Sequence, residues 1–162
     1  MKFAAGLLLA LILSPVFTAT SFAADEYWQQ GITDESYRIT VYRSPSCGCC
    51  KGWIAHLRQH NFEVNDVPVD DVQPYKNQFG VPPQAASCHT AVVNGVVIEG
   101  HVPAQDIKRL LSSEHNVRLL TVPGMPSGTP GMDTPGSPKQ DFKVYAVTRD
   151  DQAGIYNAYS DY

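Results

Sequence analysis

Positive charge is scarce in this 162-residue sequence and is nowhere gathered into a block. The chain has 12 lysine and arginine residues against 16 aspartate and glutamate residues, and its formal net charge is −4 at pH 7. A protein that binds nucleic acid through the phosphates needs clustered cations. The charge pattern therefore argues against a nucleic-acid partner.

Long apolar runs are also missing, except near the N-terminus. Lys2 places a positive charge at the start, residues 4–13 are apolar, and residues 21–23 spell the small-x-small cleavage site Ser-Phe-Ala. The apolar run is shorter than the roughly 20 residues that a membrane helix needs. Residues 1–23 are therefore predicted to be a signal peptide. We expect a periplasmic protein that keeps no membrane segment after cleavage.

Cysteine is scarce as well, but its four residues are unevenly placed. Cys47, Cys49 and Cys50 lie within four positions, and Cys88 follows much later. In an oxidising compartment an even number of cysteines usually indicates disulfides. Close neighbours are hard to bridge, because the Cα atoms of a disulfide usually lie about 4.4–6.8 Å apart. The pairs that form easily are Cys47 with Cys50, or one of these three cysteines with Cys88.

The pattern of residues 37–113 predicts a small α/β domain. Alternating and β-branched residues predict four strands, at 37–42, 62–69, 91–93 and 96–99. The last two strands flank an Asn-Gly pair, which is typical of a hairpin turn. Amphipathic spacing and Pro or Gly boundaries predict three helices, at 50–60, 70–79 and 102–111. The order β-α-β-α-β-β-α fits a thioredoxin-like fold, with a mixed sheet flanked by helices.

Two further segments flank this domain. Residues 24–36 show no sustained periodicity and are expected to form an N-terminal arm that could include a short helix. Within residues 114–162, the stretch 121–139 is rich in proline and glycine and cannot build a core. Residues 142–148 alternate like a strand, and a strand needs a partner. We therefore expect this strand to return to the edge of the sheet, with the Pro/Gly-rich stretch as a tethered loop.

The C-x-x-C motif formed by Cys47 and Cys50 follows a predicted strand and begins a predicted helix. A helix N-terminus lowers the pKa of a thiol. A thiol–disulfide oxidoreductase could use Cys47 as the nucleophile and Cys50 as the resolving thiol. Against this, Cys49 is an extra nucleophile that could shuffle the pair. Redox catalysis is therefore one hypothesis, and a binding module with two structural disulfides is another.

The fourth cysteine favours a metal site. In a thioredoxin-like fold the loop before the third strand faces the C-x-x-C turn, and Cys88 and His89 occupy that loop. Thiolates select soft metals, namely Cu(I), zinc or iron–sulfur centres. Four crowded thiolates favour bridging sulfur atoms and more than one Cu(I) ion, whereas a mononuclear site with four cysteines normally uses two C-x-x-C-like pairs. Metal binding is therefore the main hypothesis, with enzymatic redox activity left open.

Other side chains are further candidate ligands. Met125 and Met132 lie in the Pro/Gly-rich loop, and thioether is a soft ligand for Cu(I). The alternative is that both methionines pack on the surface of the domain. His101 lies between a predicted strand and helix, and its side chain could face the site or water. The remaining histidines are expected to be solvated on or near helical surfaces: His56, His60 and His115.

Three motifs together resemble a known family. They are C-G-C-C-K-G-W at 47–53, S-C-H-T at 87–90 and G-M-P-S-G-T-P-G-M at 124–132. Their combination is similar to that of the CopG-type copper-resistance proteins, long classed as a domain of unknown function. The resemblance implies an exported, thioredoxin-like protein that binds copper through its four cysteines and acts in copper tolerance. The expected partners are the metal ion and other exported copper-handling proteins.

Overall fold

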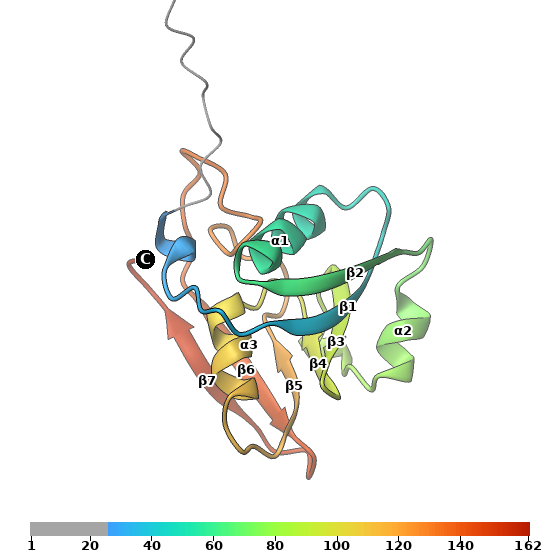
Figure 1. Ribbon diagram of the computed structural model, residues 1–162. Helices are drawn as coiled ribbons and strands as arrows, with labels where there is room; N and C mark the ends of the chain where they lie inside the picture. The colour runs from blue at the N-terminus through green and yellow to red at the C-terminus, as the bar shows by residue number, and fades with distance from the viewer. Residues whose placement is uncertain (1–25) are drawn as a thin grey trace, which may run out of the picture.

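One mixed β-sheet of seven strands runs through the part of the chain that the computed structural model describes, residues 26–162 (Figure 1). The predicted signal peptide lies outside the described residues. The strands are β1 (Tyr37–Arg43), β2 (Phe62–Pro68), β3 (His89–Val93), β4 (Val96–Glu99), β5 (Val117–Thr121), β6 (Phe142–Thr148) and β7 (Ala153–Tyr159). Their order across the sheet is β2-β1-β3-β4-β5-β6-β7.

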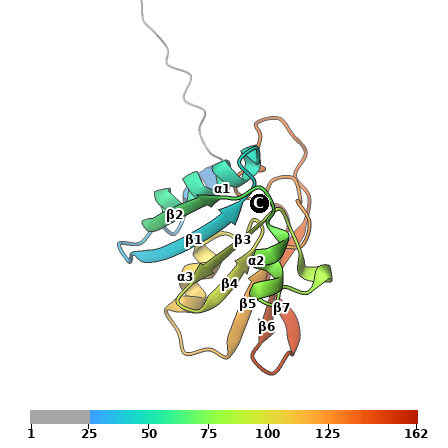
Figure 2. The ribbon, with the colours of Figure 1, turned by 90° about the vertical axis from the view of Figure 1, so that its right-hand side faces the viewer.

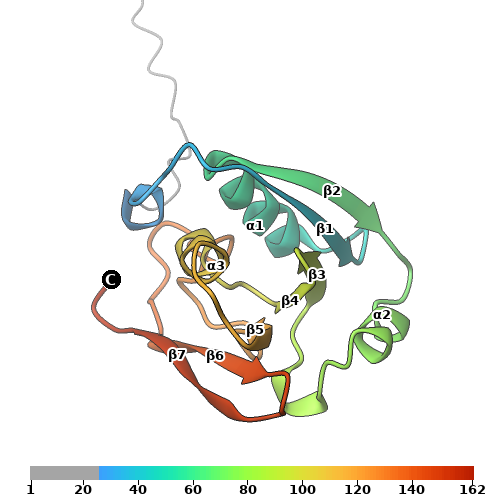
Figure 3. The same cartoon turned by 60° about the horizontal axis from the view of Figure 1, so that its bottom comes forward.

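Three α-helices and two short 3₁₀ turns complete the described elements. They are α1 (Gly48–Gln59), α2 (Gln73–Gln78), α3 (Ala104–Leu111), η1 (Glu26–Gln29) and η2 (Pro83–Ala85). Figure 3 shows the sheet curving around α1 and α3, with α2 outside the curve. No helix among the described residues is long and apolar enough to cross a membrane.

Strand pairing follows the hydrophobic pattern. β1 pairs in parallel with β2 and antiparallel with β3, and β3 forms a hairpin with β4. β4 pairs in parallel with β5, after which β5, β6 and β7 run antiparallel. In the β1–β3 register Ile39 lies opposite Val93 and Val41 lies opposite Ala91, and all four are buried. A shift by one residue would expose this apolar face.

Apolar side chains fill both faces of the sheet. The larger cluster joins α1 and α3 to η1 and to strands β6 and β7, and Trp28, Trp53 and Phe142 are among its members. A smaller cluster packs η2 against the opposite face, with Ala85 and Leu119 among its members. Helix α1 buries Trp53, Ile54 and Leu57 in the larger cluster, as the helical spacing predicts.

The observed elements differ from the predicted ones in the C-terminal half. The strands and helices expected up to residue 111 are present in the predicted order, and the strand expected at 142–148 is confirmed as β6. Two strands were not predicted, β5 and β7. Because β5 extends the sheet beyond β4, β6 pairs with β5 on one side and with β7 on the other.

Two histidines contradict the prediction of solvated side chains. His56 is only 4% exposed and His60 is fully buried, while His115 is half-buried. His56 Nε2 accepts a hydrogen bond from the Ala104 backbone N–H at 3.0 Å, and His60 Nε2 donates to the Trp28 carbonyl oxygen at 2.7 Å. Helix α1 is thus covered on this side by η1 and by the start of α3, which leaves no helical surface there for water.

The Pro/Gly-rich segment, residues 121–139, runs beside α1, as Figures 1 and 2 both show. Trp28 Nε1 donates to the Gly128 carbonyl oxygen at 2.9 Å. Gly131 lies against α1 so closely that a Cβ atom on Gly131 would come within 2.6 Å of the Cys49 carbonyl oxygen. Its φ of 83° also favours glycine. The main chain of the segment therefore packs directly on the first turn of α1.

Candidate metal centre

The cysteine turn lies between the end of β1 and the start of α1. Cys47 is the N-cap residue of α1, and its Sγ accepts a hydrogen bond from the Cys50 backbone N–H at 3.3 Å. Cys47 and Cys50 are joined by a disulfide, with Cα atoms 5.4 Å apart. Cys49 is free, and its Sγ lies 3.5 Å from that of Cys47. The helix cap therefore places all three sulfur atoms at one end of α1.

Cys88 approaches this turn from the loop before β3. Its Sγ lies 3.6 Å from Cys50 Sγ, and it is the second free cysteine of the described chain. The four cysteine sulfur atoms all lie within 4.8 Å of one another. One group of soft donor atoms thus comes from two chain segments, in which Cys50 and Cys88 are 38 residues apart.

Two buried imidazoles extend this group. His89 Nδ1 lies 3.3 Å from Cys88 Sγ, and His101 Nε2 lies 3.2 Å from the same atom. Cys88, His89 and His101 form a second set of potential ligands whose donor atoms lie within 4.8 Å of one another. Cys88 belongs to both sets. The two sets of potential ligands therefore meet at one sulfur atom.

The tautomer of His101 is fixed by the Pro/Gly-rich segment. His101 Nδ1 lies 2.7 Å from the Pro130 carbonyl oxygen, which can only accept a hydrogen bond, so Nδ1 carries the proton. The lone pair of Nε2 then points toward Cys88. Metal-binding histidines commonly donate their second N–H to a carbonyl in this way. The neutral His101 ring is thus oriented with Nε2 toward the Cys88 sulfur by a residue 29 positions away.

His89 is oriented by packing. Its ring lies 4.3 Å from the Trp53 ring, centroid to centroid, and is fully buried. Trp53 is itself held by a hydrogen bond of 2.8 Å from Nε1 to the Val102 carbonyl oxygen. His89 Nε2 has no hydrogen-bond partner. The ring therefore has one nitrogen toward the Cys88 sulfur and one enclosed in the core.

Burial controls the protonation of these groups. Burial, and secondly the nearby Cys49, raise the pKa of the Cys88 thiol to about 12. Burial is also the first cause of the lowered pKa values of His89 and His101. Without a bound cation, Cys88 is therefore a thiol and both imidazoles are neutral. Neutral imidazole donates a lone pair to metals, and a bound cation would displace the thiol proton.

The two candidate methionines lie in the Pro/Gly-rich segment, whose contacts with the site come from its main chain. Those contacts are the hydrogen bond from His101 to Pro130 and the packing of Gly131 on α1. Met125 is 54% exposed. Met132 is half-buried and lines a small cavity within its own segment. A role for either methionine as a copper ligand therefore stays a prediction.

Sequence reasoning missed the residues that support the ligands. Pro130 orients His101, and Trp53 packs on His89, but neither residue carries a chemical signal in the sequence. Arg43 is a further example. Its buried guanidinium pairs with Asp66 at 2.6 Å and donates to the Ser44 carbonyl oxygen at 3.0 Å, at the start of the cysteine turn. An arginine in an alternating strand gives no sequence signal for this role.

The comparisons with known proteins agree with this chemistry. A comparison with curated proteins found no match. The model of a family described as "Protein of unknown function, DUF411" matches residues 85–132, which contain Cys88, His89 and His101. Two solved structures are similar, described as forms 2 and 1 of the copper resistance protein CopG. They are 41% and 42% identical, with TM-scores of 0.73 and 0.72.

The matches to these structures are nearly complete. They cover 78% and 77% of this chain and 100% and 98% of the two solved chains. At this identity, the similarity holds for the amino-acid sequence along nearly the whole of each solved chain, and not for the fold alone. The chain therefore belongs to the CopG family of copper resistance proteins.

Proposed function

We propose that this protein is an exported, thioredoxin-like copper-binding protein that holds Cu(I) as a cysteine-bridged cluster in copper resistance and homeostasis. The observation that carries the proposal is the position of Cys88. Its sulfur lies 3.6 Å from Cys50 Sγ and within 3.3 Å of one nitrogen of each of two buried imidazoles. It is therefore shared by a thiolate set and an imidazole set.

The number of donors favours more than one metal ion. A structural zinc site is closed by four ligands in tetrahedral geometry. Six donor atoms are gathered here, four from cysteine and two from histidine. Thiolate is soft and selects Cu(I), and imidazole also suits copper. A cluster with bridging sulfur atoms uses all six donors, whereas a single tetrahedral ion leaves two of them unused.

The state of the C-x-x-C motif would control copper loading. In this structure Cys47 and Cys50 form a disulfide, so Cys49, Cys88 and the two imidazoles are the remaining donors. Reduction of the disulfide takes up two electrons and two protons and produces two thiols. Each thiol then loses its proton when it binds the metal. The reduced protein would therefore hold more copper than the oxidised protein.

A second function is favoured by the same disulfide. A thiol–disulfide or copper-coupled oxidoreductase would use the Cys47 and Cys50 pair, which lies at a helix N-terminus beside a free thiol. In the copper-coupled form, two Cu(II) ions each take one electron from the dithiol. The products are two Cu(I) ions, one disulfide and two protons. Cu(I) binding is the preferred proposal because Cys49 and Cys88 have no role in a simple dithiol enzyme.

Copper counting tests the proposal. The chain from Ala24, reduced and loaded with Cu(I) without oxygen, is expected to hold more than one copper ion per chain by inductively coupled plasma mass spectrometry. Cys88→Ser should lose copper. Less than one copper per chain, or a content unaffected by Cys88→Ser, would contradict the proposal. Full reductase or oxidase activity in Cys47→Ser would exclude the second function.

Export and the thioredoxin-like class are parts of this proposal with separate support. The residues that support export are the charged start, the apolar run and the cleavage motif of residues 1–23. The class is supported by α1 and the cysteine turn following β1, and by Cys88 preceding β3 opposite that turn. Fractionation of cells that make the full chain tests export. A protein found in the cytoplasm at its uncleaved mass would contradict it.

A further inference from the structure

A buried ion pair lies beside the candidate metal centre. Within the part of the chain that the structure describes, none of its hydrogen bonds goes to the side chain of a candidate ligand. Lys76 of α2 and Glu99 at the end of β4 form it, with 5% and 0% of their side chains exposed. Removing two charges from water is costly, and apolar residues of similar size would often stabilise a fold equally well. The pair therefore invites a role beyond stability.

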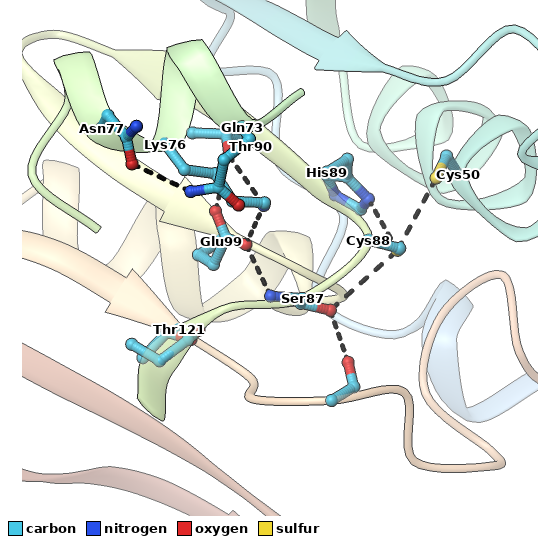
Figure 4. A network of polar contacts seen from close by, with 12 residues as sticks. Cys50, Gln73, Lys76, Asn77, Ser87, Cys88, His89, Thr90, Glu99 and Thr121 are labelled. Carbon is cyan, nitrogen blue, oxygen red and sulfur yellow. Dashed lines mark hydrogen bonds and ion pairs between the residues drawn. The ribbon is translucent and has the colours of Figure 1, made fainter. Parts of the chain in front are cut away.

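The contacts of Glu99 point to that role. Glu99 Oε1 accepts hydrogen bonds from Lys76 Nζ and, at 2.6 Å, from the Ser87 backbone N–H. Glu99 Oε2 accepts from Thr90 Oγ1 at 2.7 Å. Lys76 Nζ also donates to Thr90 Oγ1, at 3.1 Å. Figure 4 shows the carboxylate between Lys76, Thr90 and Ser87.

Ser87 and Thr90 immediately flank the Cys88–His89 dipeptide. One carboxylate thus binds the chain on both sides of two candidate ligands. Ser87 also donates through Oγ to the Gly124 carbonyl oxygen, at the start of the Pro/Gly-rich segment. The same segment holds His101 through Pro130. The ion pair is therefore connected to all three donors of the histidine-containing set.

We propose that Lys76 and Glu99 are positioning residues that hold Cys88 and His89 in place to receive copper, an inference that rests on the proposed copper-binding function. Cys88 lies just before β3, so its backbone is not fixed by the β-ladder. The Glu99 carboxylate supplies the missing anchor at Ser87, and the Lys76 ammonium compensates the buried charge. The loop is then already in place before the metal binds.

Two double variants separate positioning from charge. In Lys76→Met with Glu99→Leu, both charges are removed together and the acceptors for Ser87 and Thr90 disappear. In Lys76→Met with Glu99→Gln, the charges are also removed, but the amide oxygen can still accept the Ser87 N–H. Neither variant leaves an unpaired buried charge, so both are expected to fold. Glu63→Gln, in the exposed pair with Arg38, is the control for loss of a surface ion pair.

Copper affinity is the first readout. Competition of each reduced protein with a Cu(I) chelator under anaerobic conditions should show binding weakened about 10–100-fold in the leucine variant, as is typical when an outer-shell partner of a metal site is lost. The glutamine variant should recover most of that loss, and Glu63→Gln should match the wild type. Equal affinity of the leucine and glutamine variants would overturn the proposal. A lowered thermal midpoint with unchanged affinity would show a purely structural role, and would also overturn it.

The second readout needs no copper. In reduced, metal-free protein, iodoacetamide should alkylate Cys88 faster in the leucine variant than in the glutamine variant, measured by peptide mass spectrometry with Cys49 as the internal reference. Equal Cys88 rates would refute positioning of the loop. If the wild type itself binds no Cu(I), the proposed function fails, while the alkylation rates still decide whether the ion pair positions Cys88. The two failures are therefore distinguishable.

Discussion

His56 should make the stability of this protein sensitive to acid. Its ring is almost completely buried and accepts a hydrogen bond from the Ala104 N–H through Nε2, which requires the neutral form. Burial, and then repulsion by His60 and His101, lower the pKa of His56 to about 3. In the unfolded chain a histidine has a pKa of about 6.5. Unfolding in acid therefore takes up a proton at His56.

The sign and size of the effect follow from these two pKa values. Because the folded pKa lies below the unfolded value, the contribution to stability is complete above about pH 6.5 and falls as the pH approaches the folded value. One pH unit between the two values changes the free energy of unfolding by about 1.36 kcal/mol for each proton taken up. Lowering the pH from 7.5 to 4.5 should thus remove about 2.7 kcal/mol through His56 alone.

The variant His56→Gln isolates this contribution. The glutamine amide oxygen can accept the Ala104 N–H in place of Nε2, but it does not titrate. Urea unfolding of reduced, metal-free protein at pH 7.5 and 4.5 gives the difference in stability between wild type and variant at each pH. This difference should shift by about 2.7 kcal/mol in favour of the variant at low pH. Other titrating groups contribute to both proteins and largely cancel.

His115→Gln is the matched control for the loss of a histidine, because His115 belongs to neither described core cluster. A difference between wild type and His56→Gln that stays constant from pH 7.5 to 4.5 would refute the argument. It would mean that His56 is protonated equally in the folded and unfolded states, which contradicts its burial and its acceptor role toward Ala104.

Three further predictions concern the packing and the ligands. Gly131→Ala should destabilise the protein by about 1–3 kcal/mol more than Gly136→Ala in thermal unfolding. Both glycines have a positive φ, but only at Gly131 would the added methyl group overpack against α1. Equal losses would contradict this. Trp28→Ala should lower the free energy of unfolding in urea by about 3–5 kcal/mol, because a large buried ring and its hydrogen bond to the Pro/Gly-rich segment disappear. A loss below about 1 kcal/mol would be inconsistent with that packing. Cys49→Ser should bind less copper while the C-x-x-C disulfide still forms, as metal analysis and intact mass would show, and unchanged copper would remove Cys49 from the ligands.

Much of the fold could be predicted because the seven strands and α-helices from β1 to α3 have clear periodicity and boundaries. β5 and β7 lacked such signals. The β5 segment Val117–Thr121 contains only a short apolar pair beyond its first residue, and β7 includes Gly154 and two alanines, which have low strand propensity. These strands form because β4 and β6 offer them partners. Pairing with a distant strand is a tertiary effect that local sequence does not report.

The burial of His56 and His60 could not be predicted for a related reason. Their spacing of four residues places both on one face of α1, beside the apolar stripe. Whether that face meets water depends on η1 and on the start of α3, which lie far away in the sequence. The acceptor of the His60 proton is a backbone carbonyl of Trp28, and the donor to His56 is a backbone N–H. Backbone groups occur at every residue and therefore leave no motif.

In the candidate site, too, some residues could be predicted from the sequence and others could not. The cysteines, His89 and His101 could be proposed from the sequence because thiol and imidazole groups are rare and chemically distinctive. The groups that orient them are common ones, namely the carbonyl oxygen of Pro130 and the carboxylate of Glu99. The Pro/Gly-rich segment attracts attention in the sequence for its methionines, yet in the structure its main chain determines which nitrogen of His101 is free. A shift of this segment would change the tautomer of His101, a candidate copper ligand, without replacing any side chain of the candidate site.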